Sequence, residues 1–302
     1  MTQAIRDIAT AWQALSEEVA LWADTGKEVT LWWRDDDAIA PSVELTRLEQ
    51  LGRRYDIPLS LAVIPQSASP ELEQSLANHP ASTCVLVHGL DHHNYAVEGE
   101  KRSEFTASRP VSEMKDALSQ ALRLQTFHLS GGQQFAEKFL PVLVPPWNRI
   151  PQNMVACLSE LGFMGLSTYK ARDLANAPPG LVINNCHVDP VNWKAQKSFL
   201  GEGETLTLIT GHLSARRTHK ADFAEITGIL THHLVQDAKT WTFLEEFAAW
   251  AMEQPTVRWL DAHEVFKLSL WWRGKIGWSS QGIIIQCGHL QVITSVHQSV
   301  CF

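Results

Sequence analysis

Short apolar runs alternate with longer amphipathic segments along most of this 302-residue chain, and this alternation constrains the fold more than any other feature. Runs rich in Val, Ile, Leu and Trp are typical of strands that are buried on both faces. Amphipathic segments of ten or more residues are typical of helices. Strands that alternate with helices favour a parallel sheet, so the sequence predicts an α/β protein.

The expected elements amount to seven or eight strand–helix units, which predict a (β/α) barrel. The expected strands are residues 29–34, 57–65, 83–89, 139–146, 163–168, 181–188, 205–212 and 257–260. The clearest expected helices are residues 42–55, 112–129, 151–162 and 220–236.

Two further regions complete the expected domain organisation. A polar, aperiodic segment at 95–110 predicts a mobile loop. We assign residues 1–270 to the barrel with an N-terminal helix, and residues 271–302 to a C-terminal extension that forms a short β hairpin.

Composition excludes several classes of function. A net charge of -8 without a dense Lys/Arg block argues against nucleic acid or an anionic membrane as the partner. The five cysteines are scattered and form no CxxC pair, which argues against a disulfide framework or a thiolate zinc site. The chain shows neither a signal-peptide pattern nor a membrane span, so we expect a cytoplasmic protein with a small-molecule or glycan substrate.

The stretch "LWWRDDDAIAP" ends an apolar run in Asp35, Asp36 and Asp37. Adjacent carboxylates repel one another and lose solvation on burial, so they require a cation, a donor network or open water. Other polar residues also follow expected strands: His88 and His92, the segment 145–148, Asp189 with His187, and His212. In a parallel barrel these strand ends share one face, which predicts an active site there.

The segment "HGLDHHN" offers the best metal ligands in the sequence. His88 and His92 are four residues apart, and one turn brings both within reach of a single ion. Two imidazoles and a carboxylate suit zinc or another first-row metal and leave positions for water and substrate. His93 is the rival second ligand.

In order, "RDDDA", "HGLDH", "VPPWN", "DPVNW" and "LITGH" resemble the motifs of the polysaccharide deacetylase family, the NodB-homology or carbohydrate esterase family 4-like enzymes. The resemblance spans residues 29–213 and implies a deformed (β/α)7 barrel. It also implies a divalent transition metal, most often Zn²⁺. In the family the first Asp of the pair is the catalytic base, the second binds the metal with both histidines, and the last histidine is the acid.

We align Ala38 with the residue that follows the Asp pair of the family, which makes Asp36 the base and Asp37 the metal ligand beside His88 and His92. A shift by one residue would turn both carboxylates to opposite faces. His212 would be the acid. Asp189 completes the expected catalytic set, and the expected substrate-binding residues are Pro146, Trp147, Asn148, His187 and Trp193.

Two positions depart from the family pattern. Val144 stands where the family has the arginine that positions the base, and Asn192 stands where a second acid is common. Arg149 or Arg34 could substitute for the arginine, or Asp189 and His187 could rebuild the polar network.

The sequence thus predicts a metal-dependent hydrolase that removes an acyl group, such as acetyl, from a sugar, a glycoconjugate precursor or a related small amide. Its bond class is carbon–nitrogen, other than peptide. The alternatives are a non-catalytic carbohydrate or metabolite binding protein on the same fold, and a different metal hydrolase such as a phosphoesterase.

Overall fold

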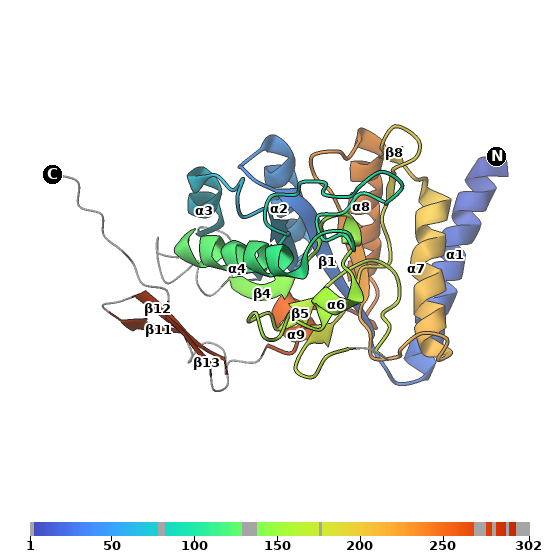
Figure 1. Cartoon of the computed structure of the whole chain (residues 1–302). Coiled ribbons are helices and arrows are strands. Elements are labelled where there is room, and N and C mark those ends of the chain that lie inside the picture. Colours follow the sequence, from blue (N-terminus) through green and yellow to red (C-terminus); the bar gives the residue numbers. More distant parts are fainter. Residues whose placement is uncertain are drawn as a thin grey trace.

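The computed structural model describes residues 3–77, 82–128, 138–174 and 177–268, together with three strands in the C-terminal segment. Its centre is a parallel eight-stranded sheet in the order β10-β1-β2-β3-β4-β5-β6, with β9 also paired to β1 (Figure 1). The strands are β1 (Val29–Ala38), β2 (Leu59–Val63), β3 (Thr83–Val87), β4 (Phe139–Leu143), β5 (Gly165–Leu166), β6 (Val182–Ile183), β9 (Thr227–Thr231) and β10 (Val257–Trp259).

A parallel bridge between Val188 and Ile229 joins the segment after β6 to β9, so the sheet curves round on itself. Helices cover its outer side (Figure 1). They are α1 (Gln3–Asp24), α2 (Val43–Arg54), α3 (Pro70–Ala77), α4 (Val111–His128), α6 (Gln152–Val155), α7 (Glu202–Arg217), α8 (Ala238–Met252) and α9 (Ala262–Val265). The expectation of an α/β barrel with surrounding helices is confirmed.

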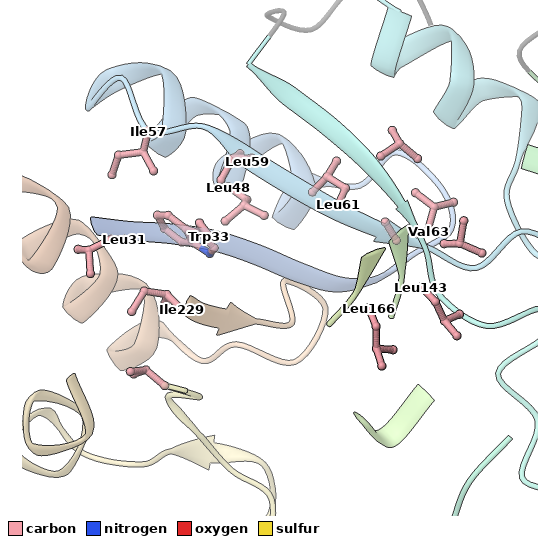
Figure 2. Close-up of a cluster of buried hydrophobic side chains, with 14 of the residues drawn as sticks. Leu31, Trp33, Leu48, Ile57, Leu59, Leu61, Val63, Leu143, Leu166 and Ile229 are labelled. Atoms are coloured by element: carbon pink, nitrogen blue, oxygen red, sulfur yellow. The ribbon is translucent and has the colours of Figure 1, made fainter. Parts of the chain in front are cut away.

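Strand β1 shows how the sheet buries both of its faces. Successive side chains of a strand point to opposite faces. Leu31 and Trp33 pack with Leu59, Leu61 and Leu48 of α2 in the cluster between sheet and helices (Figure 2). The alternate residue Trp32 belongs to a second cluster inside the curved sheet, with Leu86, Val142, Val144 and Leu230 among its members. Arg34 and Asp36 follow Trp32 on this inner face, which places them beneath the carboxyl end of the sheet.

Two of the expected elements are wrong, and a third, the expected helix 151–162, is helical only over α6 (Gln152–Val155). Residues 205–212 lie within helix α7, and the expected helix 220–236 contains strand β9. The β-branched residues favoured a strand in the first segment, but Glu202 and Glu204 in the first turn of α7 and Arg216 and Arg217 in its last turn complement the helix dipole. All five residues of β9 are buried, as suits a strand between two covered faces.

The remaining segments are short. Residues 95–110 form a loop as expected, but Ser103, Glu104 and Phe105 are buried, so this part of the loop is anchored. Strands β7 (Val191–Asn192) and β8 (Ser198–Phe199) form an antiparallel pair, and β11 (Ile276–Ser279), β12 (Gly282–Cys287) and β13 (Leu290–Ile293) form an antiparallel sheet in the C-terminal segment. Among the helices that the structure describes, none has the length and apolar character of a bilayer span.

Candidate active site

Three predicted metal ligands meet at the carboxyl ends of β1 and β3. Asp37 Oδ1 lies 3.1 Å from His88 Nε2 and 3.3 Å from His92 Nε2. The three ligand atoms all lie within 4.8 Å of one another. Two imidazoles and one carboxylate at this spacing form an open three-ligand set of the kind that holds a catalytic first-row metal.

A break in strand regularity lets Asp36 and Asp37 serve the same site. The pairing of β1 with β2 shifts register between Asp35 and Ala38, and Asp37 has a left-handed backbone with φ of 73°. A bulge of this kind re-aims a side chain that the strand would otherwise turn away. The carboxylates of Asp36 and Asp37 therefore both face the site, although in a regular strand they would point to opposite faces of the sheet.

The hydrogen bonding of His88 suits a metal ligand. His88 Nδ1 lies 2.9 Å from the carbonyl oxygen of Val144, and because a carbonyl can only accept, this nitrogen carries the proton. Nε2 is then the ring nitrogen that faces Asp37, and it would bind a metal once its proton is lost. A histidine that donates its other N–H to a backbone carbonyl is the usual arrangement around protein-bound metals.

The three ligand side chains shift one another's pKa values. Burial alone would raise the pKa of Asp37, but the hydrogen bond and charge of His88 and the charge of His232 outweigh it, so this pKa lies well below its ordinary value. Burial opposes charge on His88, yet the carboxylates Asp36 and Asp37 raise its pKa. Burial and the charge of His88 lower the pKa of His92. Asp37 therefore stays ionised beside the two imidazoles, as a ligand for a cation requires.

Glu104 holds the turn that carries His92. Its carboxylate accepts the backbone N–H groups of Leu90 at 2.8 Å and His92 at 3.1 Å, and burial raises its pKa to about 7. Gly89 and His92 both have positive φ, and a Cβ on Gly89 would lie 2.2 Å from the Glu104 carboxylate. Only glycine fits there, so loop 95–110 and the metal-ligand turn form one packed unit.

The predicted base Asp36 is held by Arg34. The guanidinium Nε lies 2.9 Å from Asp36 Oδ1 and NH2 lies 3.0 Å from Oδ2, a bidentate pair with 0% and 2% side-chain exposure. Arg34 also donates to Ser167 and to Asn148 Oδ1, at 2.7 and 2.6 Å. Of the two candidates for the missing arginine, Arg34 therefore reaches the base.

The other candidate arginine is engaged elsewhere. Arg149 donates to the backbone carbonyl of Arg102, in the loop beside the site. Val144 is fully buried among apolar side chains, so the position of the family's arginine is a packing position in this chain.

Aromatic side chains border the site on two sides. The Trp147 ring lies 4.4 Å from the His92 ring, within the short 3-10 turn Pro146–Asn148 where Trp147 has φ of 55°. Trp193 is 45% exposed and donates its Nε1–H to Asp189 at 2.7 Å. Burial raises the pKa of Asp189, which lies close enough to feel the charge of Asp36. The predicted residues Pro146, Trp147, Asn148, Asp189 and Trp193 thus surround Asp36 and the ligand set.

Two predicted site residues lie elsewhere. His212 is on helix α7, and its Nδ1 lies 2.9 Å from the hydroxyl of Thr227, the first residue of β9. His187 stacks on His212 with ring centroids 3.4 Å apart, and its Nδ1 accepts the N–H of Gly228. Both histidines therefore sit at the amino end of β9. The site lies at its carboxyl end, about 13 Å away at a rise of 3.3 Å per residue.

With Glu225, His187 and His212 form a second cluster of possible metal ligands. His187 Nδ1 accepts a backbone N–H, so the neutral ring carries its proton on Nε2, which lies 3.2 Å from Glu225. Parallel stacked rings also cannot direct two lone pairs at one ion. The cluster is a buried carboxylate with donors around it: the neighbouring His187 and His212 and the backbone N–H of Arg172 lower the pKa of Glu225 to about 2, against its burial.

His232 is the site residue that we did not predict. It follows β9 directly, its ring meets the Trp193 ring edge-on with centroids 4.7 Å apart, and its charge acts on both Asp37 and Asp189. The sequence does carry the signal, because "LTH" at 230–232 is a hydrophobic-x-His segment, whereas in "LITGH" the residue two before His212 is Thr210. The wrong assignment of β9 as helix hid it.

No family model and no curated protein matches the sequence. Among solved structures, a candidate polysaccharide deacetylase from Mycobacterium smegmatis is similar at a TM-score of 0.55 and 15% identity, covering 80% of this chain and 90% of that one. Two others are less similar, with TM-scores below 0.5. They are a peptidoglycan N-acetylglucosamine deacetylase (0.49, 13% identity, 82% and 95% covered) and a Streptomyces lividans family 4 carbohydrate esterase (0.45, 14%, 77% and 91%). The chain has the (β/α)7 fold of the polysaccharide deacetylases.

Proposed function

We propose that this protein is a metal-dependent hydrolase that removes an acyl group from an acylated sugar or a related small amide. The observation that carries the proposal is the placement of a fixed carboxylate beside an open ligand set. Asp36 is clamped by Arg34, and its chain neighbour Asp37 joins His88 and His92. A base next to three ligands is the arrangement that hydrolysis of an acyl group requires.

Asp37, His88 and His92 would hold the cation, most often Zn²⁺ for such a set. When bound, the cation would polarise the acyl oxygen and make water a better nucleophile. Asp36 would take the proton of the attacking water. Arg34 keeps both oxygens of Asp36 in one orientation, which holds this base in place while the reaction proceeds.

His232 would supply the proton to the departing nitrogen or oxygen. It lies near both Asp37 and Asp189, since its charge acts on each of them. Asp189 is itself fixed by Trp193 and by the backbone N–H of Val191. The backbone N–H of Trp147 is a candidate donor to the oxyanion, since Pro145 and Pro146 have no N–H to offer.

The two tryptophans support a sugar or another flat substrate. Trp147 and Trp193 come from different loops, and each contacts a histidine of the site: Trp147 packs on His92 and Trp193 on His232. An exposed indole gives a sugar ring an apolar face to stack on. We therefore propose binding of one acylated ring between these side chains.

The test is a hydrolysis screen on metal-free protein and on the same protein reloaded with Zn²⁺, Co²⁺ or Mn²⁺. N-acetylated sugars, O-acetylated sugars and simple N-acyl amides form the substrate set. The proposal expects release of the acyl acid by the reloaded protein at least a hundredfold above the metal-free control. Saturable substrate binding with no release on any metal would instead indicate a binding protein.

A further inference from the structure

Asp35, the first aspartate of "RDDDA", has no role in the proposed chemistry, although it is fully buried. Asp35 points to the face of β1 opposite Asp36. There its Oδ2 accepts the hydroxyl of Thr231 at 2.6 Å and the backbone N–H of His233 at 3.0 Å. Its Oδ1 meets Nδ1 of His233, whose side chain is also fully buried. All three donors belong to residues 231–233, the last residue of β9 and the two that follow it.

This segment carries His232 at its centre. The ladder between β1 and β9 ends at the pair Asp35 and Thr231, so His232 lies beyond the last residue that the sheet fixes. The Nδ1 of His232 is buried and has no hydrogen-bond partner among the residues that the structure describes. The orientation of this imidazole therefore depends on its contact with Trp193 and on the residues on either side of it. Asp35 binds both of those residues, through the side-chain hydroxyl of Thr231 and through the backbone N–H and Nδ1 of His233.

We propose that Asp35 and His233 form a positioning pair that fixes the orientation of the His232 imidazole toward the substrate. This inference rests on the proposed function, in which His232 delivers the proton. The pair touches neither the ligand set nor the substrate side. Both residues lie on the outer face of the sheet. Asp35 precedes Asp36 by one residue on β1, and His233 follows His232 by one residue.

The buried hydrogen bonds of Asp35 favour a rigid conformation of residues 231–233. The Asp35 carboxylate is desolvated, and three donors replace its water, so loosening one of them leaves a buried charge short of partners. Burial would lower the pKa of His233, but the charge and hydrogen bond of Asp35 raise it. Trp33 adds a further bond by donating Nε1–H to the Thr231 hydroxyl at 2.8 Å. The segment therefore has one strongly preferred conformation.

A double-mutant cycle tests the proposal through turnover of an N-acetyl amide by zinc-loaded protein. Asp35→Ala is expected to lower kcat by about tenfold or more with KM and metal content unchanged. In a His232→Ala background the same change is expected to lower kcat less than twofold, because the residue on which Asp35 acts is gone. An equal loss in both backgrounds overturns the proposal, since a general structural effect would be additive.

Two variants guard against loss of the fold. Asp35→Asn keeps an acceptor for Thr231 and for the His233 N–H, so it is expected to retain kcat within about threefold of the parent. The matched control Glu18→Gln breaks a bidentate pair with Arg217 between α1 and α7, and is expected to leave kcat unchanged. Loss of activity in Asp35→Asn as severe as in Asp35→Ala would contradict a hydrogen-bonded clamp.

A readout without catalysis separates this inference from the proposed function. In a histidine-labelled sample, the Cε1–H resonance of His232 is assigned by its loss in His232→Ala. The parent and Glu18→Gln are expected to give one sharp resonance at the same position, and Asp35→Ala a shifted or broadened one. An unchanged resonance in folded Asp35→Ala overturns the positioning role even if the parent hydrolyses nothing. A changed resonance in an inactive parent supports it while the proposed hydrolase activity fails.

Discussion

Arg34 and Asp36, two residues apart on β1, form a bidentate ion pair inside the curved sheet, and both side chains are almost fully buried. Residues i and i+2 of a strand point to the same face, so the strand itself brings the guanidinium beneath the carboxylate. A valine at 144 is then compatible with the proposed active site, because Asp36, the proposed base, receives an arginine from its own strand.

Breaking this pair is expected to destabilise the protein strongly. Arg34→Met leaves a buried carboxylate without a cation and is expected to cost about 3–5 kcal/mol in urea unfolding. Adding Asp36→Asn removes that charge. The double variant is therefore expected to lose less unfolding free energy than the sum of the losses in the two single variants. Arg54→Met, in the exposed pair with Glu245, is the control and is expected to cost about 1 kcal/mol or less. Strict additivity at Arg34 and Asp36 would contradict the pairing.

His232 and His212 are expected to respond differently to the leaving group. His232→Ala should slow hydrolysis of an N-acetyl amide far more than that of a nitrophenyl ester, because nitrophenolate departs without a proton. A loss of about 10²–10⁴-fold on the amide would suit a general acid. His212→Ala should affect both substrates alike, through stability. The reverse pattern, with selective loss in His212→Ala, would return the acid role to His212.

Acid is expected to destabilise the fold through His187. Burial, against the hydrogen bond of Glu225, lowers the pKa of His187 to about 4. The unfolded chain binds this proton near the ordinary pKa of 6.5 and the folded chain does not, so stability is full above pH 6.5 and falls as the pH drops toward 4. A shift of this size corresponds to about 3 kcal/mol.

The measurement is the free energy of unfolding in urea at several values of pH between 7 and 4.5. His187→Gln is expected to lose part of the pH dependence, corresponding to about one proton taken up on unfolding. His93→Gln, which changes an exposed histidine, is expected to keep the slope of the parent. Parallel curves for the parent and His187→Gln would show that His187 titrates normally.

Much of the fold follows from local sequence. Strands such as 83–87 and 139–143 are buried on both faces and read as unbroken apolar runs, and these were predicted. The segments 205–212 and 227–231 both combine threonine with isoleucine and leucine. Helix α7 owes its conformation to charges at its ends and to packing against α1, which a search for apolar runs does not weigh.

Part of the site was predictable because it, too, is encoded by local sequence patterns. The spacing of His88 and His92 and the run of aspartates are local signals, and the structure brings them together. The choice of His212 over His232 depended on which segment forms the strand. The roles of Asp35 and Glu104 depend on partners such as His233 and the N–H of Leu90, which no local pattern indicates.

The most direct test of the metal-dependent hydrolase is metal content measured beside amide hydrolysis in Asp36→Asn and Asp37→Asn. We predict that the parent protein binds one divalent metal per chain. Asp36→Asn should keep this metal and lose about two to four orders of magnitude in turnover, because an amide cannot take the proton of water. Asp37→Asn should lose metal and activity together. Metal retained in Asp37→Asn but lost in Asp36→Asn would contradict the assignment of base and ligand.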